Sequence, residues 1–174
     1  MSKAKILTAS VATAMAALAL QPAPALAAVG PDRDACLPRS GRTALIVNVR
    51  GFRERAGNLR VALYGSNPAD FLARGRSLRR IDVPVSRAGT MQVCVALPGP
   101  GRYAVAVRHD ANGNGQSDWN DGGGFSRNPA LYLPNPRPDF GRVVFNARQG
   151  LQAIYVTLNY RSGLNIAPVP GGGR

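Results

Sequence analysis

Short segments with aliphatic residues at every second position recur along this chain, and turns rich in glycine and proline separate them. In residues 58–64, for example, the aliphatic side chains would all fall on one face of an extended strand. Further strands are expected at residues 43–50, 78–85, 90–97, 102–108, 140–146 and 151–160. Helical periodicity is almost absent, apart from a single turn expected within residues 69–74. Short strands at regular spacing predict an all-β fold, an antiparallel β-sandwich.

Two connections look like hairpins, one over residues 86–89 and one over residues 147–150. The strands define one sandwich domain over residues 43–161. The last part of the chain, residues 162–174, is rich in glycine and proline and has little to bury. We expect it to be a disordered tail.

The N-terminus has the features of a secretory signal peptide over residues 1–27. Lys3 and Lys5 charge its start, residues 6–20 are apolar, and residues 25–27 match the small-residue cleavage pattern. A membrane span needs about 20 apolar residues, so this run is short for one, although an uncleaved anchor is the alternative. We expect export to the periplasm or the medium.

Two cysteines, Cys36 and Cys94, would remain after export. In an oxidising compartment such a pair forms a disulfide more often than two free thiols. Cys94 points away from the apolar face of its expected strand, so a disulfide would tether the N-terminal segment, residues 28–42, to the outer side of the sheet. No CxxC motif is present, and we expect a structural disulfide.

The most distinctive segment is an acidic loop at residues 110–121. Against the twelve-residue calcium-binding template, Asp110, Asn112 and Asn114 fall at positions 1, 3 and 5. Gly115 falls at position 6, where the sharp turn needs glycine. The candidate Ca²⁺ ligands are Asp110, Asn112, Asn114, Gln116, Asp118 and Asp121. The template ends in a bidentate Glu, and here the shorter Asp takes that place.

The loop can also be interpreted as a turn that binds no metal. It follows an expected strand and precedes a glycine run, Gly122–Gly124, so the helices that flank the template are missing. Asp and Asn are common turn formers because their side chains bond the nearby backbone. Both a Ca²⁺ site and a metal-free turn therefore remain open. Ca²⁺ would bind weakly, with a dissociation constant of about 10⁻⁴–10⁻³ M.

The chain is strongly basic, with a net charge of +13. Without Lys3 and Lys5 there are 20 arginines against nine acidic residues, a net charge of +11. An anionic cell-envelope polymer is one partner that such a charge would attract; scattered surface charge without function is the other reading. The loose arginine clusters are Arg50, Arg53 and Arg55, and Arg74, Arg76, Arg79 and Arg80. Few aromatic residues accompany them, so nucleic acid is not expected.

Enzymatic chemistry has little support. His109 is the only histidine, and neighbouring residues on a strand point to opposite faces, so His109 and Asp110 would not orient one another. We therefore expect no catalytic residues, with a hydrolase using the acidic loop as a minor alternative. Trp119 lies near the end of the loop, and Phe125 follows it. If exposed they could stack on a sugar ring; we favour the reading in which they are buried and cap the sandwich.

Four stretches resemble, in order and spacing, the domain of unknown function 2141 family: residues 51–64, 97–107, 109–115 and 124–128. The resemblance extends over roughly residues 45–158. It implies an exported bacterial β-sandwich of immunoglobulin-like or transthyretin-like type, and no biochemical activity. Family members commonly have a longer stretch after the acidic loop, and Arg127 stands where they have Asn. The positions that transfer are Asp110, Asn112, Asn114 and Asp118.

Together these features predict an exported β-sandwich with a non-catalytic binding or structural role in the cell envelope and a candidate weak Ca²⁺ loop. A domain that binds carbohydrate or an anionic polymer is the alternative function.

Overall fold

The computed structural model describes residues 28–170. The expected signal peptide, residues 1–27, and residues 171–174 lie outside this part. The strands are β1 Ala44–Arg50, β2 Asn58–Tyr64, β3 Arg79–Pro84, β4 Met91–Ala96, β5 Gly101–Asp110, β6 Gly122–Phe125, β7 Phe145–Ala147, β8 Leu151–Thr157, β9 Asn159–Ser162 and β10 Asn165–Pro168. Within residues 28–170, helical structure is limited to the 3-10 helices η1 (Arg33–Cys36) and η2 (Pro68–Asp70) and the short helix α1 (Phe140–Val143).

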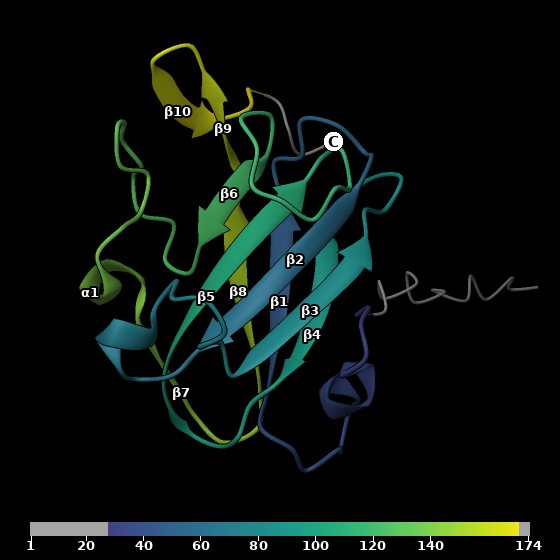
Figure 1. The fold of residues 1–174 in the computed structure, drawn as a ribbon. Helices are drawn as coiled ribbons and strands as arrows, with labels where there is room; N and C mark the ends of the chain where they lie inside the picture. The colour runs from purple at the N-terminus through teal and green to yellow at the C-terminus, as the bar shows by residue number, and fades with distance from the viewer. Residues whose placement is uncertain (1–27, 171–174) are drawn as a thin grey trace, which may run out of the picture.

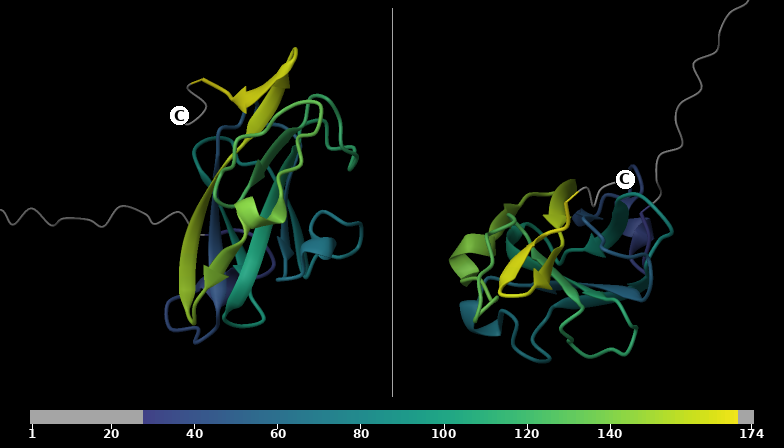
Figure 2. Two further views of the ribbon diagram at one scale, coloured as in Figure 1. Left: turned by 90° about the vertical axis from the view of Figure 1, so that its left-hand side faces the viewer. Right: turned by 90° about the horizontal axis from the view of Figure 1, so that it is seen from above.

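The strands form two sheets that lie face to face, seen edge-on in the left view of Figure 2. The smaller sheet has the order β4-β1-β8, and the larger has the order β10-β9-β6-β5-β2-β3 (Figure 1). β7 pairs with the start of β5. All named pairs are antiparallel except β1 and β8, which are parallel. The predicted all-β sandwich is confirmed.

Alternation along the strands explains the core. Leu45, Val47 and Val49 of β1 point between the sheets, as do Leu59, Val61 and Leu63 of β2, and all six are fully buried or nearly so. Burying one such side chain contributes about 1.5–3 kcal/mol. The chain crosses from the smaller to the larger sheet at Leu158, itself fully buried between β8 and β9.

Both expected hairpins are wrong. β3 pairs with β2 and β4 pairs with β1, so residues 85–90 cross from one sheet to the other. Likewise β7 pairs with β5, while β8 pairs with β1. The period of two shows which residues face the core, but it does not show which strand lies alongside.

Three further segments differ from expectation. Residues 140–143, which we expected to begin a strand, form the helix α1. β6 is a strand although three of its four residues are glycine, because Gly122 and Gly124 allow Tyr160 and Val156 to pack against the backbone. β10 forms a hairpin with β9 inside the segment that we expected to be a disordered tail. The helical turn expected within residues 69–74 is present as η2, slightly earlier in the chain.

The N-terminal segment covers part of the outer face of the smaller sheet. Cys36 and Cys94 form the expected disulfide, and η1 contacts β4 and β1. Val29 extends the edge of β4, since its N–H donates to the carbonyl of Gln92 at 2.7 Å. No helix within residues 28–170 has the length and apolar character to span a membrane.

Candidate functional site

The end of β5 separates two neighbouring residues onto opposite faces of the larger sheet. His109 points into the sandwich and is fully buried. Its Nε2–H donates to the carbonyl of Ala56 at 2.8 Å, and its Nδ1 accepts from the hydroxyl of Tyr160 at 2.6 Å. Burial raises the pKa of Tyr160 to about 12, which keeps this hydroxyl protonated. Asp110 points to the outer face, so the two side chains do not orient one another.

Asp110 anchors the acidic loop. Its Oδ2 accepts the N–H of Gly115 at 2.8 Å, and its Oδ1 is buried without a hydrogen-bond partner among the described residues. Asn112 Oδ1 accepts the N–H of Asn114 at 3.1 Å, and Asn114 Oδ1 accepts the N–H of Gln116 at 2.8 Å. The two asparagine bonds, each to the backbone two residues on, are of the type by which Asp and Asn hold a turn.

The second half of the loop is held by two carboxylates. Asp118 accepts hydrogen bonds from the side-chain amides of Asn112 at 2.8 Å and Asn114 at 2.6 Å, and these bonds lower its pKa. Asp121 accepts the N–H groups of Ala111 and Asp118. Between residues 28 and 170, no group of three or more His, Cys, Asp or Glu side chains is arranged to hold a metal ion. The loop thus brings the predicted ligand residues close in space while most of their oxygens serve its own hydrogen bonds.

The expectation that Trp119 is buried and caps the sandwich is wrong. It is 71% exposed. The guanidinium of Arg161 in β9 stacks on its ring, 3.2 Å from the ring centroid. Phe125 is half-buried and makes an edge contact with Phe71. Of the two aromatic residues, Trp119 is the more exposed, although Arg161 stacks on its ring.

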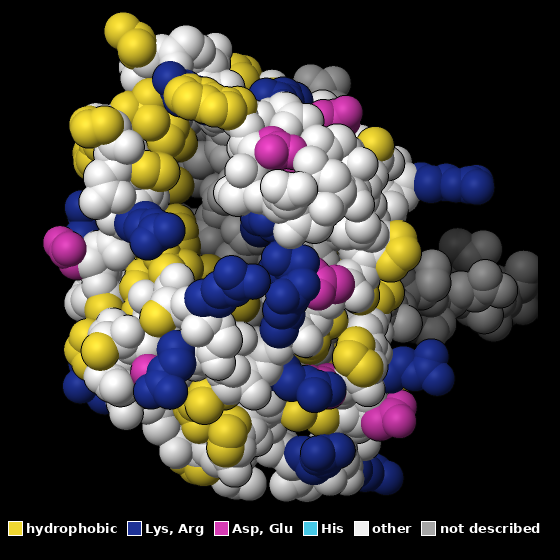
Figure 3. Space-filling model, in the orientation of Figure 1, with side chains coloured by type: hydrophobic (Ala, Val, Ile, Leu, Met, Phe, Trp, Pro, Cys, Tyr) yellow, Lys and Arg dark blue, Asp and Glu magenta, His cyan; other side chains and the backbone are white. Residues whose placement is uncertain are grey.

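A groove of about 570 Å³ lies beside this loop on the outer face of the larger sheet. β2, β5, β6 and β9 contribute its floor, the loop at residues 117–121 forms one wall, and residues 131–137 form the other. Figure 3 shows it as a hollow beside the loop, with basic side chains grouped below it. The predicted loop residues Asp118, Trp119 and Asp121 line it, as does Phe125.

The middle of the floor is made of small residues. Ala62 of β2 lies opposite Ala106 of β5, and Gly123 of β6 lies opposite Arg108 of β5. A methyl group built at Gly123 would meet no atom within 4 Å. The absence of long side chains at these positions is what leaves the groove open.

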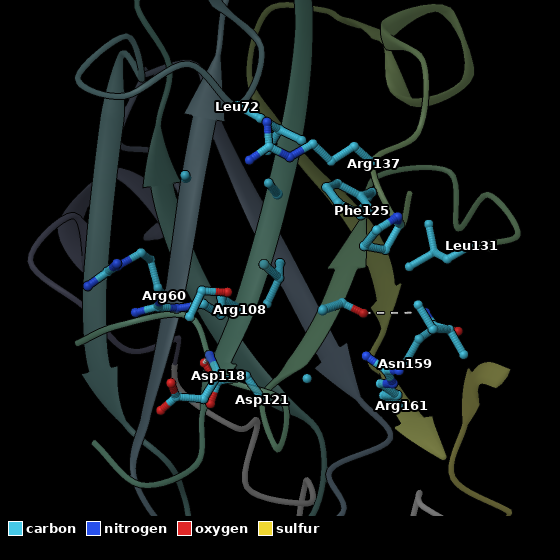
Figure 4. A pocket seen from close by; sticks show the side chains of 18 of the residues that line it. Arg60, Leu72, Arg108, Asp118, Asp121, Phe125, Leu131, Arg137, Asn159 and Arg161 are labelled. Carbon is cyan, nitrogen blue, oxygen red and sulfur yellow. Dashed lines mark hydrogen bonds between the residues drawn. The ribbon is translucent and has the colours of Figure 1, made fainter. Parts of the chain in front are cut away.

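Four arginines line the groove, and they come from four separate segments: Arg60, Arg108, Arg137 and Arg161. Figure 4 shows Arg137 and Arg161 at opposite ends of the groove and Arg60 beside Arg108. Arg60 and Arg108 face each other in the β2–β5 register.

The arginines of the groove differ in their partners. Arg60 pairs with Asp82 at 2.6 Å. Arg108 pairs with Asp110 at 3.4 Å and donates to the carbonyl of Gly115 at 2.9 Å, but its buried Nε has no partner. No described carboxylate forms an ion pair with Arg137 or Arg161.

The arginine clusters visible in the sequence do not form this site. Arg79 pairs with Asp32 and Arg76 pairs with Asp70, while the groove collects isolated arginines up to 101 positions apart, from residue 60 to residue 161. The sequence offers one signal: in both β2 and β5 an arginine and an alanine stand two positions apart and so share the outer face of the strand, Arg60 with Ala62 and Arg108 with Ala106.

The family model described as "Uncharacterized protein conserved in bacteria (DUF2141)" matches residues 47–154. This range includes the acidic loop and three of the four groove arginines; Arg161 lies beyond it. No curated protein and no solved structure gives a significant match to the chain.

Proposed function

The chain belongs to the DUF2141 family, and we propose that it is an exported, non-catalytic module that binds an anionic polymer of the cell envelope in the groove on the larger sheet. The observation that carries this proposal is the convergence of four arginines from distant segments on one open groove. Guanidinium groups bind carboxylates and phosphates through two parallel hydrogen bonds. The chain's net charge of +13 would also draw polyanions toward it.

Export is supported by two features. Residues 1–27 have the pattern of a signal peptide. The disulfide between Cys36 and Cys94 is of the kind that persists in oxidising compartments.

A non-catalytic role fits the position of the single histidine. His109 is fully buried, and both ring nitrogens are engaged within the protein. A general base must come within hydrogen-bond reach of a substrate proton, and His109 lies on the opposite face of the sheet from the groove. The groove itself contains arginines, two carboxylates and small residues, which suit binding.

A charge-matched pair of variants tests the function. The double variant Arg137→Gln/Arg161→Gln removes the two groove arginines that have no carboxylate partner. The control, Arg87→Gln/Arg102→Gln, removes two exposed arginines outside the groove. Binding of heparin, polyphosphate and polygalacturonate would be measured by calorimetry at fixed salt. Each lost charge-assisted contact should weaken binding about tenfold in the groove variant, against a small change in the control. Equal losses in the two variants, or no binding of any polymer, would refute the proposal.

Weak Ca²⁺ binding by the loop is a second candidate, favoured by one observation. The side chain of Asp110 is 4% exposed, and its Oδ1 has no partner. A cation in the loop would satisfy this oxygen, with Asn112 and Asn114 as further oxygen donors. Calcium titration up to about ten millimolar, well above the expected dissociation constant, would be followed by thermal melting and by the emission of the single Trp119. A response that Asp110→Asn abolishes and Asp34→Asn preserves supports the site; an unchanged melt excludes it.

A further inference from the structure

We infer that the ligand of the groove is an acidic glycan, a polymer whose sugar rings carry carboxylates. This inference rests on the proposed function and adds the chemical class of the polymer. Such a ligand has three features that the groove could read separately: flat rings with apolar C–H faces, hydroxyl groups, and carboxylates at intervals.

The groove has surfaces for the flat rings. Trp119 presents an exposed indole at the edge of the groove. Beyond it the floor is low, because Ala62, Ala106 and Gly123 rise no higher than a methyl group. A sugar ring can lie flat on such a floor, and another can stack on the indole, whose second face is held by Arg161.

The wall of the groove contains acceptors for hydroxyl groups. Asp118 and Asp121 both line it. The bonds from Asn112 and Asn114 lower the pKa of Asp118, so this carboxylate stays ionised and can accept hydroxyl hydrogens. Ionised carboxylates repel any anionic group, so they favour a ligand that offers hydroxyl hydrogens as well as charge. An acidic glycan has several hydroxyl donors for each charged group, whereas polyphosphate has none along its chain.

The arginines are spaced for separated carboxylates. Arg137 and Arg161 lie at opposite ends of the groove (Figure 4), and neither forms an ion pair with a described carboxylate. Arg60 and Arg108 lie side by side across β2 and β5, at the flank of the groove (Figure 4). A chain of uronic acid residues would place one carboxylate on each sugar, and guanidinium groups at intervals match that pattern.

The test compares ligands that differ in one feature each. Calorimetry would measure binding of a tetramer of α-1,4-linked galacturonate, the neutral tetramer maltotetraose, polyphosphate, and vesicles of phosphatidylglycerol. We expect the galacturonate tetramer to bind at least about tenfold more tightly than the neutral one, as expected for charged contacts. Trp119→Ala should weaken its binding about tenfold, and the control Tyr155→Ala, another exposed aromatic residue outside the groove, should leave it unchanged.

Gly123→Val provides a second variant, because a side chain here enters open space in the groove. It should abolish galacturonate binding while the melting temperature stays the same. If Gly123→Val fails to fold, Trp119→Ala still tests the glycan inference, because the exposed Trp119 contributes little to the core. Equal affinity for the two tetramers, or binding of polyphosphate or vesicles alone, would overturn the glycan inference. If binding of polyphosphate or vesicles still depended on Arg137 and Arg161, the glycan inference would fail but the proposed function, binding of an anionic polymer in the groove, would stand.

Discussion

Tyr160 donates its hydroxyl hydrogen to Nδ1 of the fully buried His109, at 2.6 Å. The bond joins β9 to the end of β5, directly beneath the acidic loop. It gives the histidine that precedes the loop a structural role.

Tyr160→Phe should therefore destabilise the protein. The variant leaves Nδ1 of His109 buried without a donor, which costs about 1–3 kcal/mol. Urea unfolding would measure the loss as a lower midpoint at unchanged slope. Tyr155→Phe, which removes an exposed hydroxyl, serves as the control. Equal midpoints for the two variants would show that the buried bond adds nothing.

The three glycines of β6 should respond differently to alanine. A methyl group at Gly122 would lie 2.5 Å from the ring of Tyr160, and one at Gly124 would lie 2.6 Å from Val156, whereas Gly123 has free space. Gly122→Ala and Gly124→Ala should each cost about 1–3 kcal/mol through overpacking. Gly123→Ala should be neutral or stabilise by about 0.4–1 kcal/mol. Thermal melts of the three variants would measure these differences in stability. A loss for Gly123→Ala equal to that of the other two would contradict the open space at Gly123.

Alternation along the chain made the core predictable, because the period of two decides which residues face inward. Leu59, Val61 and Leu63 are buried as expected. The pairing of the strands was not predictable. β1 and β8 are adjacent in the sheet although about 100 residues separate them in the sequence, and no local sequence feature specifies their register. β6 escaped prediction because glycine carries no alternation.

The site was predictable only in part. The loop residues stand together in the sequence, so their proximity needed no fold. The order of the strands brings Arg60, Arg108 and Arg161 to one groove, and the segment of residues 131–137 adds Arg137. Each of these arginines alone looks like ordinary surface charge. Exposure of Trp119 depends on how far the loop projects, which the sequence does not specify.

The N-terminal segment should make stability depend on acid pH through Asp32. Burial acts to raise the pKa of Asp32, but its hydrogen bonds from Arg79 and the N–H of Ala96 prevail and lower it. The lowered pKa gives stability that is present above about pH 4, the unfolded value, and is lost as the pH falls through the folded value.

Asp32→Asn should accordingly cost about 1–2 kcal/mol at neutral pH, a moderate figure because Arg79 is half-exposed. The difference from wild type should shrink as the pH falls below about 4. Asp34→Asn, at an exposed position, is the control. Unfolding curves at several pH values would measure both, and a constant difference across the pH range would argue against the Asp32 contacts as its cause.

Loss of the disulfide should destabilise the sandwich as a whole. Cys36 and Cys94 are 58 residues apart, and closing a loop of that length stabilises by about 4 kcal/mol in the chain-entropy model. Cys36→Ala/Cys94→Ala should lower the midpoint of urea unfolding accordingly. Wild type unfolded in the presence of reductant should match the double variant; a wild type that is insensitive to reductant at its midpoint would contradict the prediction.

The central claim is that an anionic polymer binds in the groove, and Trp119 offers the most direct measurement of it. Because this is the only tryptophan in the chain, its indole N–H gives a single signal in a nitrogen–proton correlation spectrum. On titration with the galacturonate tetramer, we predict that this signal shifts together with the backbone signals of Ala106 and Gly123 on the floor. Shifts confined to the arginine-rich surface outside the groove, with the Trp119 and Gly123 signals unmoved, would contradict the account.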